Sequence, residues 1–304
     1  MKFIVAHTSP DLDAITSVWL IKKFLPGWED ALVKFIPAGE RLCELPKGQG
    51  FEYAIEKKGQ DEYIHVDTGL GPLDHHQTSD QNVCAASLTL DYVTTEMKKS
   101  VPAMSEDKLE ALKRIVGVVT EDDHFREIFW GDPVADYHEF NLINILEGLK
   151  LKNPDQDEYY LQFTFEVLDA IRDEFDNRIW AEKEIKENGT EFKTRFGKGI
   201  GFKTINDTVV KLAQKMGYVV VVRKDPRKGY VRIKARPDED QDSKTKDGKL
   251  DLTLVYEKLK KMDPQATWFL HVSKKMLLNG TTKNPKMKPT KLSLDAIIEV
   301  IKKI

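Results

Sequence analysis

The segment HTSPDLDA at residues 7–14 concentrates side chains that could bind metal ions. It follows a short apolar run and holds His7, Asp11 and Asp13. Imidazole nitrogens and carboxylate oxygens suit Mn²⁺, Mg²⁺ or Zn²⁺, and no nearby cysteine favours a softer metal. Asp11 and Asp13 are two residues apart, so they could face different ions if the chain turns between them.

Three further segments carry the same kinds of side chain. In chain order, they hold Asp67; then Asp74, His75 and His76; then Glu121, Asp122, Asp123 and His124. An Asp-x-Asp pair alone is common in turns and helix caps, and a pair of histidines is common on protein surfaces. The combination of all four segments in one half of the chain, each after an apolar run, favours a metal site.

The elements that would position these residues alternate between short strands and amphipathic helices. Strands are predicted at residues 3–6, 32–36 and 63–67, and helices at 14–25, 84–96 and 106–119. This alternation is typical of a mostly parallel sheet with flanking helices. Sites in such sheets form at the carboxyl ends of the strands, where His7, Asp11, Asp13 and Asp67 all fall.

The second half of the chain has a different pattern. Apolar residues recur every three or four positions over 156–186, and Asn188-Gly189 then supplies a helix stop. Further on, the sequence predicts a hairpin at 218–236, a loop at 237–249, a helix at 250–262, a strand in ATWFLHVS and a final helix at 294–304 capped by Ser293.

These elements predict an α/β fold with two domains. We expect a metal-binding catalytic domain at 1–150, a connecting helix at 151–190 and a smaller, basic α/β domain at 191–304 that binds substrate. The length of 304 residues allows two separate cores.

Composition narrows the class of protein. Cys43 and Cys84 are the only cysteines and form no CxxC pair, so a disulfide scaffold is not expected. The sequence shows neither a membrane-spanning stretch nor a signal peptide, and we expect a cytoplasmic protein without a membrane partner. The net charge is −3, yet residues 191–304 hold 27 Lys and Arg against 13 Asp and Glu. This excess could attract a polyanion or could simply favour solubility.

The order His-x-x-x-Asp-x-Asp, strand-end Asp, then Asp-His-His resembles the DHH phosphoesterase superfamily. That family includes single-strand exonucleases, oligoribonucleases, cyclic-dinucleotide phosphodiesterases and family II inorganic pyrophosphatases. The resemblance covers the first half of the chain. It implies a centre of two divalent metal ions, usually Mn²⁺, with Mg²⁺ or Zn²⁺ as alternatives.

The resemblance also implies roles for individual residues. His7 and Asp11 would hold one ion, Asp13 and His75 the other, and Asp67 would bridge both. Two catalytic residues complete the set: His76 would point at the substrate phosphate, and Asp74 would orient a histidine.

The fourth segment departs from the family pattern. Family members often carry a Thr-Asp-Thr-like element here, whereas this chain has VTEDDHF. Glu121, Asp122 or Asp123 could supply the last metal ligand. We favour Asp123, because Phe125 follows it closely and could anchor this segment in the apolar core.

The last third of the chain matches the family less closely. The family's smaller domain usually carries an arginine near a strand end, which Arg236 or alternatively Arg232 would supply. It also carries a glycine-rich segment with a histidine, for which WFLHVSKKMLLNG offers His271, Asn279 and Gly280 as substrate-binding residues. The usual glycine run before the histidine is missing here, which leaves the substrate class open.

Together these features predict a Mn²⁺-dependent hydrolase. We expect it to cleave phosphodiester bonds of short single-stranded nucleic acid or of a nucleotide second messenger, with a water activated by two ions. The alternatives are a pyrophosphatase or small phosphomonoesterase, and a non-catalytic regulator that binds metal or nucleotide. The expected partner is the nucleic acid or nucleotide substrate, and a homodimer is left open.

Overall fold

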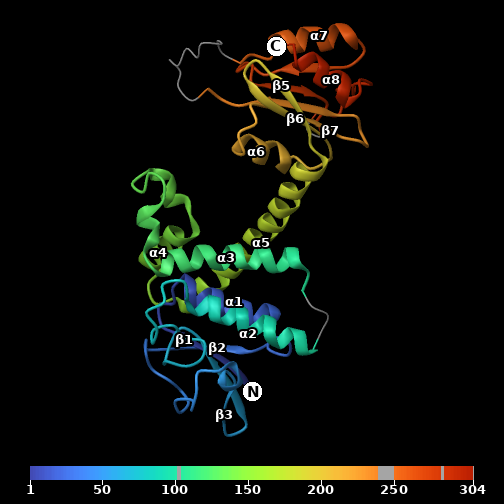
Figure 1. Ribbon diagram of the computed structural model, residues 1–304. Helices are drawn as coiled ribbons and strands as arrows, with labels where there is room; N and C mark the ends of the chain where they lie inside the picture. The colour runs from blue at the N-terminus through green and yellow to red at the C-terminus, as the bar shows by residue number, and fades with distance from the viewer. Residues whose placement is uncertain (101–103, 239–249, 282–283, 304) are drawn as a thin grey trace. The chain divides into compact units, whose positions relative to one another are not determined.

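A computed structural model describes residues 1–100, 104–238, 250–281 and 284–303 of the chain. The chain divides into two compact units, Met1–Asp176 and Asn177–Ile304. Helix α5 (Asp157–Asn188) contributes to both units, and its extent matches the helix predicted at 156–186 (Figure 1). Each unit combines helices with a β-sheet, which confirms the expected α/β class.

The first unit is built on a four-stranded sheet of order β2-β1-β4-β3. Strand β1 (Lys2–His7) lies between β2 (Leu32–Ile36) and β4 (Asp61–His65) and runs parallel to both. Strand β3 (Glu56–Lys58) pairs antiparallel with β4 and was not predicted, because its short polar sequence has no apolar alternation. Since β4 ends at His65, Asp67 lies two residues beyond the strand instead of ending it.

Besides α5, this unit contains further helices. They are α1 (Leu12–Phe24), α2 (Ala85–Ser100), α3 (Glu106–Asp123) and α4 (Leu142–Lys152), with short 3-10 helices η1 (Phe51–Tyr53), η2 (Arg126–Phe129) and η3 (Asp136–Phe140). Every residue of α1 from Leu12 to Ile21 is buried, because α1 packs on β1, α2 and α3 at once. A charged residue in the first turn of α1 is therefore carried into the interior of the unit.

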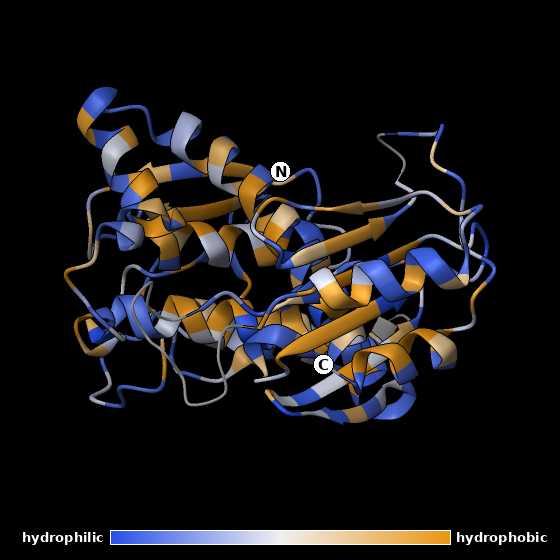
Figure 2. Cartoon of the chain, turned by 90° about the horizontal axis from the view of Figure 1, so that it is seen from above, coloured by the Kyte–Doolittle hydropathy of each residue, from blue (hydrophilic) through white to orange (hydrophobic). Residues whose placement is uncertain are grey.

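The second unit has a six-stranded sheet of order β5-β6-β7-β8-β10-β9, in which only β6 and β7 are parallel neighbours. Its strands are β5 (Thr190–Thr194), β6 (Gly197–Lys203), β7 (Val220–Lys224), β8 (Val231–Ala235), β9 (Trp268–Leu270) and β10 (Met276–Asn279). Its remaining helices are α6 (Thr208–Lys215), α7 (Thr253–Met262) and α8 (Leu294–Ile301). In Figure 2 the helices carry both hydrophobic and hydrophilic residues, whereas several strands are hydrophobic over most of their length.

Several predictions for this unit are confirmed. Strands β7 and β8 form the hairpin predicted at 218–236. Ser293 Oγ accepts a hydrogen bond of 3.1 Å from the Ala296 N–H and caps α8, as expected. Residues 239–249 of the predicted loop lie outside the described residues. Among the helices of the described ranges, none combines the length and the apolar composition that crossing a membrane requires.

Candidate metal centre

The first candidate ligands lie where β1 leads into α1. His7 is the last residue of β1, and Asp11 is the N-cap of α1, since its Oδ1 accepts a hydrogen bond of 2.9 Å from the Ala14 N–H. The other oxygen of Asp11, Oδ2, lies 3.6 Å from His7 Nε2. Ser9, between them, has a φ of 52° and donates its N–H to Asp157 Oδ1 at 3.0 Å. Asp11 therefore caps a helix with one oxygen and faces His7 with the other.

The loop after β4 is closed by a buried carboxylate. Asp74 Oδ2 accepts the Leu70 N–H at 2.7 Å, and Oδ1 accepts both the backbone N–H of His76 at 3.0 Å and its ring Nδ1–H at 2.7 Å. The side chain of His76 is 59% exposed, against 1% for that of Asp74. Asp74 thus fixes the orientation of an exposed imidazole whose Nε2 makes no hydrogen bond within the described chain.

Asp67 stands between two histidines from different loops. Its Oδ2 lies 3.3 Å from His7 Nε2, and its Oδ1 lies 3.6 Å from His75 Nε2. The residue is buried and has a φ of 51°. A single buried carboxylate therefore turns one oxygen toward each histidine.

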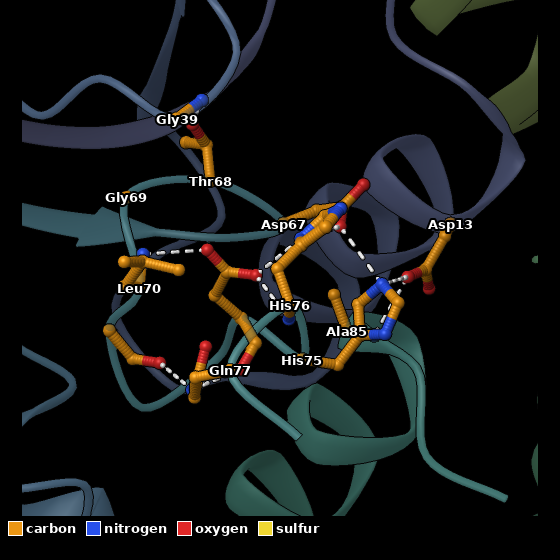
Figure 3. Close-up of polar contacts among 12 residues, drawn as sticks. Asp13, Gly39, Asp67, Thr68, Gly69, Leu70, His75, His76, Gln77 and Ala85 are labelled. Atoms are coloured by element: carbon orange, nitrogen blue, oxygen red, sulfur yellow. Dashed lines mark hydrogen bonds and ion pairs between the residues drawn. The ribbon is translucent and has the colours of Figure 1, made fainter. Parts of the chain in front are cut away.

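His75 faces three carboxylates from three different elements. Besides its contact with Asp67, the His75 Nε2 lies 3.7 Å from Asp13 Oδ2 and 3.5 Å from Asp123 Oδ2. Figure 3 shows the His75 ring between Asp67 and Asp13. His75, Asp13 and Asp123 thus form a second group, which shares Asp67 with the group of His7 and Asp11.

Asp13 joins the first turn of α1 to the start of α2. Its Oδ2 accepts the Ala85 N–H and its Oδ1 accepts the Ala86 N–H, both at 2.7 Å. The positive end of the α2 dipole and two hydrogen bonds favour a negative charge on this buried side chain. These bonds also fix the direction in which Asp13 faces His75.

The fourth segment lies in a helix and not beyond one. The helix predicted at 106–119 continues as α3 to Asp123, with His124 as its C-cap, because TEDD contains no residue that stops a helix. A carboxylate at this end faces the negative pole of the helix dipole, which a bound cation would offset. Glu121 pairs with Arg126 at 2.8 Å, whereas Asp123 faces His75. Within the described chain, the candidate clusters include Asp123 and neither Glu121 nor Asp122.

His124 lies within reach of the same ion as His75 and Asp123, although the sequence suggested no role for it. Its Nε2 is 2.9 Å from the Val83 carbonyl oxygen and 3.7 Å from Asp123 Oδ2. Its ring stands edge-on to that of His75, with 5.8 Å between the centroids. The only sequence signal was its position directly after Asp123.

The electrostatics of the centre favour bound protons when no cation is present. Burial lowers the pKa of His7, but its contacts with Asp11 and Asp67 outweigh burial and raise that pKa to about 10. Contact with Asp67 raises the pKa of His75 to about 9. For Asp13, burial and the carboxylates around it outweigh the hydrogen bonds from α2 and raise its pKa well above the usual range. A divalent cation would replace these protons as the positive charge among the carboxylates.

Three atoms of the cluster support a cation most directly. Asp67 Oδ1, His75 Nε2 and Asp123 Oδ2 are buried and have no hydrogen-bond partner in the described chain. Buried polar atoms are rarely left in this state. Two ligand atoms held about 2.1 Å from one ion lie about 3 to 3.5 Å apart, close to the 3.3–3.7 Å between facing nitrogens and oxygens here. The residues present therefore fit divalent cations.

The stability of the metal-free protein is expected to fall as the pH rises from about 6.5 to about 9. The folded-state pKa values of His7 and His75, about 10 and about 9, lie above the unfolded value of 6.5. Their contribution to stability is therefore complete below about pH 6.5 and is lost as the pH rises through the folded values. Each group adds a slope of about 1.4 kcal/mol per pH unit.

Urea unfolding in EDTA at pH 6.5, 7.5 and 8.5 measures this slope. Saturating Mn²⁺ should flatten it, because metal binding releases the protons. A free energy of unfolding in EDTA that stays constant or increases over this range would contradict the expectation.

Arg236 and His271 lie at the same end of the second unit's sheet. Arg236 follows β8 and His271 follows β9, and both strands pair antiparallel with β10, so they run in the same direction. The His271 Nδ1 lies 2.8 Å from Ser273 Oγ. Arg232, the alternative to Arg236, forms an ion pair of 2.5 Å with Asp207.

Asn279 and Gly280 lie at the opposite end of β10. The Asn279 side chain is fully buried, donates to two backbone carbonyls and accepts the Thr290 N–H at 2.6 Å. Gly280 has a φ of 80°, and a Cβ there would lie 2.0 Å from the Tyr230 ring. Both positions thus have structural reasons for their residue types, and the structure separates them from the predicted arginine and histidine.

No protein-family model and no curated protein matches the chain. Among solved structures, an uncharacterized protein from Helicobacter pylori G27 shares 13% identity over 99% of both chains, with a TM-score of 0.26. A pGpG-specific phosphodiesterase, PggH, from Vibrio cholerae shares 12% identity over 98% of both chains, with a TM-score of 0.23. With TM-scores this low, neither likeness carries an argument about the fold or the activity of this chain.

Proposed function

We propose that this chain is a metal-dependent phosphodiesterase of the DHH type, acting on short single-stranded nucleic acid or a nucleotide second messenger. The observation that carries the proposal is the placement of Asp67. One of its oxygens faces His7 and the other faces His75, and Oδ1 is buried without a hydrogen-bond partner. A bridging carboxylate between two cations accounts for this arrangement.

Under this proposal the ligands divide into two sets that share Asp67. His7 and Asp11 complete one set, and Asp13, His75 and Asp123 complete the other. Two divalent ions bound there, most commonly Mn²⁺ in this family, would supply Lewis-acid stabilisation of phosphoryl charge and lower the pKa of a water.

Residues outside the two sets position the ligands and the substrate. Ala85 and Ala86 hold both oxygens of Asp13 through their N–H groups, so the ligand is fixed before substrate arrives. Asp74 accepts the Nδ1–H of His76 and so orients the ring, whose Nε2 can then face a phosphoryl oxygen of the substrate. The excess of positive charge in residues 191–304 favours a polyanionic substrate.

The proposal is tested with the full chain loaded with Mn²⁺. An oligoribonucleotide, a linear and a cyclic dinucleotide, pyrophosphate and p-nitrophenyl phosphate are offered separately. We expect hydrolysis of at least one phosphodiester, and loss of this activity in EDTA. Hydrolysis of pyrophosphate or of the monoester alone would favour the alternative enzymes. Metal binding without any hydrolysis would favour the regulator.

A further inference from the structure

We infer that the aromatic segment directly after the metal centre is the surface on which nucleobases of the substrate stack. The segment runs from residue 125 to residue 140, between α3 and α4 (Figure 1). The inference rests on the proposed function, because it concerns the substrate of the same site. It assigns a substrate that carries bases, and it makes Phe125 the ring nearest the phosphate to be cleaved.

Four aromatic side chains of this segment are unusually exposed. Phe125 is 75% exposed, so it is not the apolar anchor expected behind Asp123. Phe129 is 81% exposed, Tyr137 61% and Phe140 85%. A single exposed apolar residue is ordinary on a protein surface. Four exposed rings in one short segment that begins directly after the metal centre are not ordinary, and they indicate a binding surface for a ligand that is itself flat and aromatic.

The chain itself places the first of these rings next to the centre. Phe125 follows Asp123 by two residues, so their Cα atoms are no more than about 7.6 Å apart. The ring therefore starts from a backbone position close to that of Asp123, whose carboxylate faces His75.

Both neighbours of Phe125 are held in place. His124 is within hydrogen-bond distance of the Val83 carbonyl, at 2.9 Å, and the Arg126 guanidinium pairs with Glu121 at 2.8 Å. Arg126 also donates to the Gln81 carbonyl. Phe125 thus projects from an anchored stretch of backbone, which is what a stacking platform requires.

The backbone at Phe125 is strained. Its φ of 54° lies in the left-handed region, which glycine and asparagine adopt far more readily than a bulky residue. Strained residues of this kind cluster at active sites and ligand clamps. An exposed ring on a strained backbone gains nothing from the core, so its use is at the surface.

Stacking suits the phosphodiester substrates and not the smaller ones. Every base has a π-face, so aromatic rings bind single strands with little regard to sequence. Loss of one such contact typically weakens binding roughly 5- to 150-fold. Pyrophosphate has no ring to stack, and the segment would contribute nothing to its binding.

The test measures binding and turnover separately. Affinity for a fluorescein-labelled tetra-adenylate is measured by anisotropy in the presence of Mg²⁺, on wild type and on Phe125→Ala, each also carrying His76→Ala to prevent cleavage. We expect Phe125→Ala to weaken binding at least about fivefold, and Phe129→Ala to weaken it less. An abasic strand of the same length should bind equally to both, because it offers no base.

Two further substitutions separate stacking from simple apolar contact. Phe125→Trp should retain the affinity, whereas Phe125→Leu, which keeps the apolar character, should lose most of it. Leu254→Ala, which removes an exposed apolar side chain from α7, is the matched control and should change nothing.

The possible outcomes distinguish this inference from the proposed function. Hydrolysis by wild type with unchanged tetra-adenylate affinity in Phe125→Ala would overturn the stacking surface alone. Absence of hydrolysis in every assay would overturn the phosphodiesterase and leave the affinity comparison to decide the stacking. A shift from dimer to monomer in Phe125→Ala by sedimentation, with affinity unchanged, would make the segment a subunit interface and overturn the inference.

Discussion

The Asp67→Asn variant is expected to bind fewer than two metal ions. Its kcat should fall at least about 1000-fold, which corresponds to about 4 kcal/mol of transition-state stabilisation. An asparagine offers one neutral oxygen where the proposed bridge needs two charged ones. The substitution suits the backbone, because asparagine accepts the left-handed φ of 51° as readily as aspartate does. Isothermal titration with Mn²⁺ and steady-state assays on the phosphodiester measure both losses.

Asp91→Asn is the matched control, since Asp91 is an exposed aspartate of α2 outside the cluster. It should bind two ions and turn over like wild type. If Asp67→Asn kept two ions and its turnover, Asp67 could not be the bridging ligand, and the two-ion arrangement would be wrong.

Asp13→Ala is expected to destabilise the metal-free protein by about 2–4 kcal/mol. The change leaves the N–H groups of Ala85 and Ala86 buried without their acceptor, and each unpaired group costs about 1–3 kcal/mol. Relief of repulsion with the neighbouring carboxylates offsets part of this loss. Asp13→Asn keeps one acceptor and should lose about half as much.

Urea unfolding in EDTA isolates this effect from the loss of metal. The control is Ser105→Ala, which removes the exposed N-cap of α3 and should cost no more than about 1 kcal/mol. Equal losses for Asp13→Ala and Ser105→Ala would mean that the bonds to α2 contribute no more than an ordinary cap.

Local sequence predicted the elements whose patterns are strong. The buried run at β1, the hairpin β7–β8 and the periodic helix α5 are all present, because apolar alternation and apolar periodicity report directly on burial. Strand β3 and helix α4 were missed, as were β5, β6, α6 and β10 of the second unit. The first is a three-residue polar edge, and the second has a single buried residue, Leu146.

The site was harder to predict where it depends on contacts between distant residues. The types and order of His7, Asp67 and His75 suggested a metal centre, and the structure brings them together. That Asp13 accepts from Ala85 and Ala86 could not be read from the sequence, since the partners are 72 and 73 residues away and only backbone groups take part. The extension of α3 through Asp123 was missed because the charged TEDD shows no apolar periodicity, although it contains no residue that stops a helix.

The residues with a left-handed backbone in and around the centre lower the stability of the folded protein. In the described chain, seven non-glycine residues have a positive φ, and four of them flank the site: Ser9, Asp67, Leu70 and Phe125. Each costs up to about 1–2 kcal/mol relative to glycine, and together they approach a sizeable part of the 5–15 kcal/mol that keeps a typical domain folded. Laboratory evolution for heat resistance alone would therefore tend to accumulate glycine at these positions, and the more tolerant variants would be the poorer catalysts.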